Sequence, residues 1–188
     1  MNIRASVLGI FVFIIAASAS AGDGNKVPLA APDSDIIFNA KDIVISSDYI
    51  PDTENNVDTI MTPSPADKIK QRLADTFFAT TEGTNVLNFI ITEASIKEEY
   101  IKSDSWFSSG QFKYAANFAL NMQLVDSKGK VIANAICKSW GVRTISGGSS
   151  IEEREKSLSD MTDKLIDNLI LQVREEAERG FKPYLKAK

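Results

Sequence analysis

The sequence predicts an α+β domain, a two-layer sandwich in which two helices cover one face of a four-stranded mixed sheet. The predicted element order is β-α-β-β-β-α. Apolar residues at every second position predict a long strand with one buried face. These residues are Phe112, Tyr114, Ala116, Phe118, Leu120, Met122 and Leu124. Two segments with apolar residues at every third or fourth position predict amphipathic helices, which need a sheet to cover.

The first helix is predicted to begin at residue 65. Ser64 is a favourable N-cap, Pro65 fits the first helical position, and Asp67 lies in the positively polarised first turn. Ile69, Leu73 and Phe77 then form its apolar stripe, and Glu82-Gly83 is predicted to end it. The final helix is predicted over residues 150–179. Ser150 and Glu153 have the spacing of a capping box, and Gly180 is the predicted stop.

The remaining segments complete the sheet. Residues 35–46 predict one strand or two short strands broken near Asn39-Ala40, and residues 49–64 predict a loop. Residues 86–101 predict a long strand whose apolar parity shifts at Thr92-Glu93, which indicates a bulge. Residues 126–129 form a tight turn, and residues 130–144 return as the hairpin partner. The side chains on one face of residues 130–144 are small, so a helix could approach that face closely.

The N-terminus predicts export. Arg4 is followed by an apolar run over residues 5–17, and Ala19-Ser20-Ala21 provides the small residues of a cleavage site. The run is shorter than the roughly 20 residues that a membrane-spanning helix needs. We therefore expect a signal peptide over residues 1–21, a disordered leader over 22–34, one domain over 35–180 and a tail over 181–188.

This organisation indicates a periplasmic or secreted protein. A lipid-anchored protein needs a cysteine as its first mature residue, and this chain has Gly22 there. No lipid anchor is therefore expected.

Composition narrows the possible functions. The formal net charge of −4 disfavours nucleic acid and anionic membranes as partners. The chain has no histidine, which removes histidine-dependent catalysis and the usual zinc sites. Cys137 is the single cysteine, so no intramolecular disulfide can form; we expect it to be a small apolar residue facing a helix. We expect no cofactor, no metal and no enzymatic activity.

Trp106 and Phe107 are the candidate partner-binding residues. They lie in a loop rich in serine and glycine, where large aromatic side chains can anchor a protein partner. The alternative is that the loop folds back and buries them under the sheet edge. An exposed edge strand would be a further contact.

The element order and several short motifs resemble small envelope proteins of Gram-negative bacteria. The motifs are Ala66-Asp67-Lys68-Ile69, Glu93-Ala94-Ser95-Ile96, Tyr114 within its long strand, and Ile151-Glu152-Glu153-Arg154-Glu155. The families concerned are the lipopolysaccharide-assembly lipoproteins and the auxiliary lipoproteins of ABC-type lipid transporters. The resemblance implies a non-catalytic scaffold within a transport or assembly complex, and it assigns no functional residue. These families are mostly lipid-anchored, whereas this chain lacks the anchor cysteine.

The leading hypothesis is therefore an exported accessory protein that binds an envelope protein complex, with any membrane contact indirect. The alternative is a carrier that holds a lipid or another apolar ligand between sheet and helices, lined by Phe112, Tyr114 and Phe118. Such a carrier requires a cavity of several hundred Å³. A hydrolase is a third hypothesis. Without histidine it would need a Ser-Lys or carboxylate pair, which would show as a buried carboxylate or lysine with a shifted pKa in a cleft.

Overall fold

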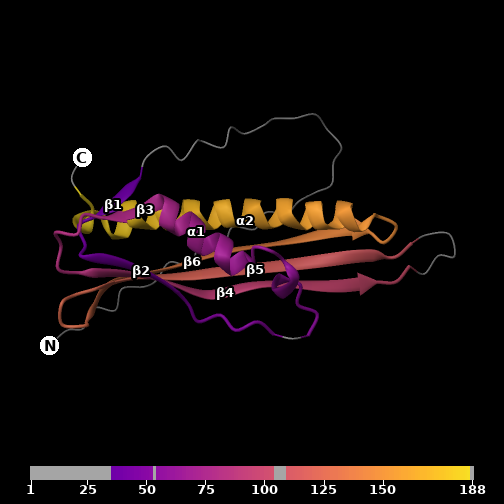
Figure 1. Cartoon of the computed structure of the whole chain (residues 1–188), viewed down its shortest axis with the longest axis horizontal. Coiled ribbons are helices and arrows are strands. Elements are labelled where there is room, and N and C mark those ends of the chain that lie inside the picture. Colours follow the sequence, from indigo (N-terminus) through magenta and orange to yellow (C-terminus); the bar gives the residue numbers. More distant parts are fainter. Residues whose placement is uncertain (1–34, 53, 104–108, 187–188) are drawn as a thin grey trace, which may run out of the picture. The chain divides into compact units, whose positions relative to one another are not determined.

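The computed structural model describes residues 35–52, 54–103 and 109–186 (Figure 1). Its main sheet has the strand order β2-β4-β5-β6. These strands are β2 (Asp42–Ser47), β4 (Val86–Ile101), β5 (Gln111–Val125) and β6 (Val131–Ser146). Strand β2 runs parallel to β4, and the β4-β5 and β5-β6 pairs are antiparallel. The predicted mixed sheet is confirmed.

Two helices, α1 (Pro65–Thr76) and α2 (Ile151–Gly180), lie on the same face of this sheet (Figure 1). The side chain of Ser64 accepts a hydrogen bond from Asp67 N, and the predicted capping box of Ser150 and Glu153 is formed in both directions. Lys68 and Asp163 form an ion pair between the helices at 2.8 Å. The predicted α+β sandwich is therefore confirmed.

A second, two-stranded sheet was not predicted. Helix α1 ends at Thr76 rather than at Glu82-Gly83, and β3 (Phe77–Ala79) pairs in parallel with β1 (Ile36–Phe38). Phe77 still reaches the core from this extended segment, since its ring centroid lies 5.0 Å from that of Phe89. Strand pairing outweighed the helical periodicity of residues 77–82. The break near Asn39-Ala40 is correct, because it separates β1 from β2.

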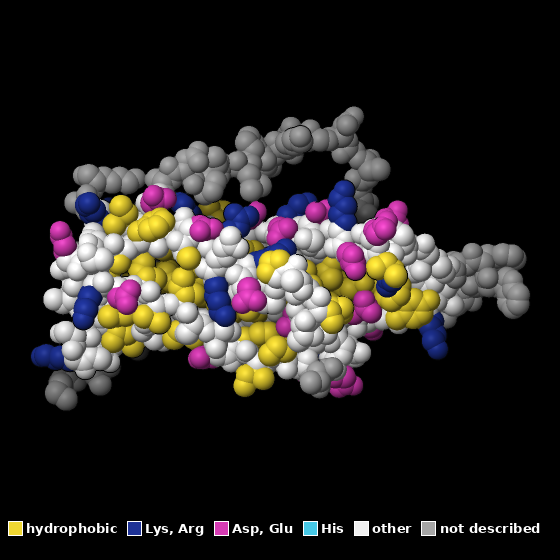
Figure 2. Space-filling view, in the orientation of Figure 1, with side chains coloured by type: hydrophobic (Ala, Val, Ile, Leu, Met, Phe, Trp, Pro, Cys, Tyr) yellow, Lys and Arg dark blue, Asp and Glu magenta, His cyan; other side chains and the backbone are white. Residues whose placement is uncertain are grey.

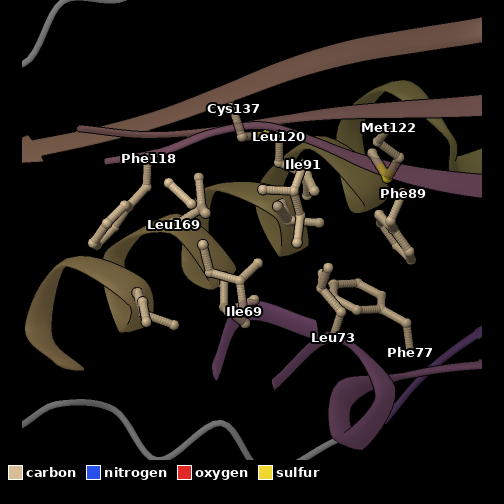
Figure 3. Packing of buried hydrophobic residues seen from close by; sticks show 14 of the residues in the cluster. Ile69, Leu73, Phe77, Phe89, Ile91, Phe118, Leu120, Met122, Cys137 and Leu169 are labelled. Carbon is tan, nitrogen blue, oxygen red and sulfur yellow. The ribbon is translucent and has the colours of Figure 1, made fainter. Parts of the chain in front are cut away.

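The core fills the space between the strands and the helices (Figure 3). Leu73 of α1 and Leu169 of α2 are fully buried, as is Phe89 of β4. The ladder between β4 and β5 shifts register between Ile91 and Glu93, which confirms the predicted bulge. Because a bulge adds one residue to one strand, it lets both parity sets of β4 face the helices. The buried members are Leu87, Phe89, Ile91, Ala94 and Ile96.

Strand β6 turns its small side chains toward α2, as predicted. Ala135, Cys137 and Ser139 are buried on this face. A Cβ atom placed on Gly141 would lie 3.2 Å from Cδ2 of Leu165, so α2 approaches the strand closely here. Beyond α2, Phe181 is buried and packs edge-on against Phe38, with ring centroids 6.2 Å apart.

Helix α2 offers a matched test of which side faces the core. Leu169 is fully buried, whereas Leu171 is 55% exposed. We expect Leu169→Ala to lower the free energy of unfolding by about 2–5 kcal/mol, because it leaves a cavity. Leu171→Ala should change the same quantity by less than about 0.5 kcal/mol. Urea unfolding of both variants measures the difference, and equal losses would contradict this orientation of α2.

Candidate functional site

Among the residues that the structure describes, α1 and α2 lie on one face of the sheet and no long helix lies on the other, which we call the outer face. Beyond the register shift at its start, over residues 133–146, β6 exposes three large apolar side chains there, and we call them the outer patch. They are Ile136, Trp140 and Val142, with exposed fractions of 50%, 49% and 54%. They alternate with the buried residues of β6, because successive side chains of a strand point to opposite faces. The close approach of α2 to the small face therefore leaves the large side chains in solvent.

The neighbouring strand adds little cover to this patch. Ile136, Trp140 and Val142 pair with Asn121, Asn117 and Ala115 of β5. Paired residues on one face are close neighbours, and the side chains of β5 here are short. The indole of Trp140 thus has no large apolar neighbour directly across the ladder. Isolated surface apolar residues are ordinary, but a group of them on an edge strand is typical of an interaction surface.

The free edge of β6 is the second part of this site. Among the described strands, β6 pairs only with β5. Lys138 N–H points away from β5 and donates a hydrogen bond to Oε1 of Gln172, at 3.2 Å. In an antiparallel ladder, residues two apart direct their backbone groups to the same side. The N–H and C=O groups of Ile136, Trp140 and Val142 therefore also point outward.

Lys138 gives this edge a positive charge. Its side chain is exposed on the outer face, between Ile136 and Trp140 in the alternation. It forms no ion pair with another described residue. Edge strands often carry lysine, which discourages indiscriminate strand pairing. The side chain of Gln172 has the same effect, because it occupies the backbone N–H of Lys138.

Two surface pockets lie elsewhere. One, of about 310 Å³, lies between the helices, and its lining includes Lys68 and Asp163, which pair with each other, and Arg72. Arg72 pairs with Asp167 at 3.0 Å. The charges of this pocket are thus largely neutralised within the protein.

The other pocket, of about 400 Å³, lies beside the loop before α1. Asp58 is part of its lining and is 3% exposed. Its Oδ2 accepts a hydrogen bond from Tyr49 Oη at 3.0 Å, and Asn56 Nδ2 donates to the same hydroxyl at 2.9 Å. The backbone of this loop also binds the edge of β4, through Val57 N–H to Ile96 O and Glu98 N–H to Asn55 O. The network fastens the loop onto β4.

Asp58 is the buried carboxylate that a hydrolase would require. Burial raises the pKa of its carboxyl group, against the lowering effect of the hydrogen bond from Tyr49. No lysine or second carboxylate hydrogen-bonds to Asp58 among the described residues. Its hydrogen bond with Tyr49 helps to hold the loop in place, and the nearby carboxylate of Glu93 raises the pKa of Asp58 further.

The predicted partner-binding residues Trp106 and Phe107 lie outside the described residues. Of the predicted ligand-binding residues, Tyr114 and Phe118 are buried in the core, and Phe112 is half-buried. The Arg154 guanidinium lies 4.3 Å from the centroid of the Phe112 ring. None of the three lines either pocket described above. The carrier hypothesis stays a prediction.

Cys137 is buried, as predicted. Burial raises the pKa of its thiol to about 12, so the reactive thiolate is scarce at neutral pH. The described part of the chain contains no cluster of three or more acidic, cysteine or histidine side chains suited to a metal ion. Within the same residues, no helix has the length and apolar character needed to span a membrane.

No family model and no curated protein matches the chain. Solved structures similar to it include a minor lipoprotein from Acinetobacter baumannii, at 11% identity and a TM-score of 0.42, covering 79% of this chain and 97% of that one. Another is the rare lipoprotein B from Shewanella oneidensis, at 13% identity and a TM-score of 0.41, covering 71% and 94%. A third is an uncharacterised lipoprotein B from Nitrosomonas europaea, at 10% identity and a TM-score of 0.39, covering 73% and 81%.

All three of these proteins are named as lipoproteins. At such identities and TM-scores, the likeness assigns no function and no residue role. The outer patch and the open edge were also not among the residues singled out by sequence. The available signal was the contrast between the small and large faces of residues 130–144.

The raised pKa of Asp58 predicts a specific pH dependence. The folded protein binds this proton more tightly than the unfolded chain does, so the stability contributed by Asp58 is fully present below its unfolded pKa of about 4. It is lost as pH rises through the folded pKa. Asn at this position is always neutral and keeps an acceptor for Tyr49. We therefore expect the stability of Asp58→Asn, relative to the unmodified protein, to increase between about pH 3 and about pH 7.

Urea unfolding across this pH range measures the difference. The control is Asp160→Asn, which changes an exposed carboxyl of α2. If the stability of Asp58→Asn relative to the unmodified protein instead decreases as pH rises, the folded protein stabilises the ionised form of Asp58.

Proposed function

We propose that the protein is an exported, non-catalytic accessory protein that binds a protein partner of the cell envelope. The observation that carries this proposal is the outer patch, three half-exposed apolar side chains on a strand whose edge has no strand partner among the described residues. Aromatic side chains in such positions are frequent anchors of protein interfaces. The export signal expected over residues 1–21 supports an extracytoplasmic location.

The chemistry of the described residues supports binding over catalysis. The thiol of Cys137 is held protonated by burial, the charges of the interhelical pocket are paired, and Asp58 fastens a loop. The outer patch, by contrast, has no internal role, because its side chains contribute nothing to the core between sheet and helices. Retaining exposed apolar surface costs solubility, and a partner that covers it would remove that cost.

Trp106 and Phe107 are proposed as a second contact. The ladders place Ile101, Gln111 and Ser146 in register, so the chain enters and leaves their loop at the same end of the sheet. Tyr100 and Ile101 of β4 and Ile151 of α2 are exposed at this end. Figure 2 shows hydrophobic side chains gathered at this end of the sheet. A partner that covers both the outer patch and this end would contact Trp140 together with the exposed Tyr100.

The proposal predicts that Trp140→Ser weakens capture of the partner. The mature chain, crosslinked within the envelope of the cells that make it, should recover a defined protein set. We expect Trp140→Ser to reduce this recovery by at least about tenfold, because a central aromatic anchor contributes much of the binding energy. Quantitative mass spectrometry measures the recovery, and urea unfolding checks that the variant remains folded.

The matched control is Leu171→Ser. Leu171 is as exposed as Trp140 but lies on α2, away from the outer face. The control should keep full recovery. Equal recovery with both variants would contradict a role of the outer patch, and recovery of lipid alone would favour the carrier hypothesis instead.

A further inference from the structure

We propose that the partner adds a β-strand to the free edge of β6 and places an acidic side chain opposite Lys138. This inference rests on the proposed function and specifies how the partner binds. Its geometric basis is that the outward backbone groups of β6 and the outer patch belong to the same residues, Ile136, Trp140 and Val142. A strand that pairs with this edge therefore also places every second side chain against the patch.

The charge of Lys138 defines the chemistry of the added strand. Lys138 is exposed, has no ion-pair partner among the described residues, and lies between Ile136 and Trp140 on the outer face. An added strand lies directly beside this position, so its side chain opposite Lys138 should be acidic and the two flanking side chains on that face should be apolar. Opposite charges directly across a ladder stabilise strand pairing.

A second copy of this chain fits the edge less well. The exposed even-numbered residues of β6 are Ile132, Asn134, Ile136, Lys138, Trp140, Val142, Thr144 and Ser146. None of them is acidic. Pairing of β6 with another β6 would thus leave both Lys138 side chains without an acidic partner on this face, whatever its register.

Gln172 acts as a removable cover of this edge. Its Oε1 accepts the Lys138 N–H bond at 3.2 Å, at the centre of the proposed pairing region. An added strand must take over this hydrogen bond. Removing the Gln172 side chain should therefore strengthen binding, whereas loss of an ordinary surface contact would weaken it. The side chains of the added strand that point toward α2 would lie near Glu175, Glu176 and Arg179, which carry both signs of charge, so the test peptide has uncharged Ser and Thr there.

The test uses a nine-residue peptide, Thr-Ser-Val-Thr-Glu-Thr-Val-Ser-Thr, added to the full mature chain. NMR amide shifts of β6 report binding. We expect saturable shifts centred on Lys138, and about tenfold weaker binding to Lys138→Glu. A peptide with lysine in place of its glutamate should restore binding to that variant. Gln172→Ala should bind the original peptide about fivefold more tightly, in keeping with the net contribution of one hydrogen bond.

Backbone pairing is tested on the peptide, which leaves the protein unchanged. One peptide is N-methylated at its odd positions and another at its even positions, because alternate N–H groups of a strand point to opposite sides. We expect one of the two N-methylated peptides to lose binding to the protein and the other to retain it. Equal binding of both sets, or the absence of saturable shifts, would overturn strand addition.

Two further outcomes are informative. If Trp140→Ser abolishes recovery of the partner, while both N-methylated forms of the test peptide bind equally well, the proposed function holds and strand addition fails. If the amides of β6 become protected from hydrogen exchange as the protein concentration rises, without any peptide, a second copy occupies the edge. This result would also overturn the inference.

Discussion

The close contact between α2 and the small face of β6 is the constraint on which the rest of the structure depends. Gly141 leaves room for Leu165. The other residues that β6 turns toward α2 also have small side chains: Ala135, Cys137 and Ser139. A long helix can then cover the edge strand directly, and its apolar stripe completes the core. Larger side chains on this face would move α2 outward and open the space that now holds Leu169 and Phe118.

The same contact determines the character of the outer face. Side chains of β6 alternate, so a strand whose small residues face the helix presents its large residues to solvent. Trp140 and its neighbours are exposed because, in the described part of the chain, helices cover only the opposite face of the sheet. Helix α2 also brings Gln172 within reach of the edge, where it covers the Lys138 donor. Core packing, the open patch and the partly covered edge are thus consequences of one helix position.

The sequence was sufficient for features that depend on periodicity and local capping. The alternation over residues 112–124, the parity shift near Glu93 and the capping box of Ser150 each predicted the observed element. It was insufficient for β1 and β3, since strands of three residues have almost no periodicity and depend on each other for pairing. The candidate site was missed for a related reason. Trp140 is apolar in sequence, and its exposure follows from the number of layers, which is a tertiary property. The bond from Lys138 to Gln172 joins residues 34 positions apart, which no local pattern reveals.

The most direct test of this account is residue-resolved hydrogen exchange along β6 in the isolated mature chain. Amides that point toward β5, at Ala135, Cys137 and Ser139, should exchange slowly. Those of Ile136, Trp140 and Val142 should exchange fast, with Lys138 intermediate because Gln172 accepts its bond. This alternation would establish an open edge beside the outer patch. Uniformly slow exchange along β6 would mean that another segment already pairs with it, and the account of an edge available to a partner would be wrong.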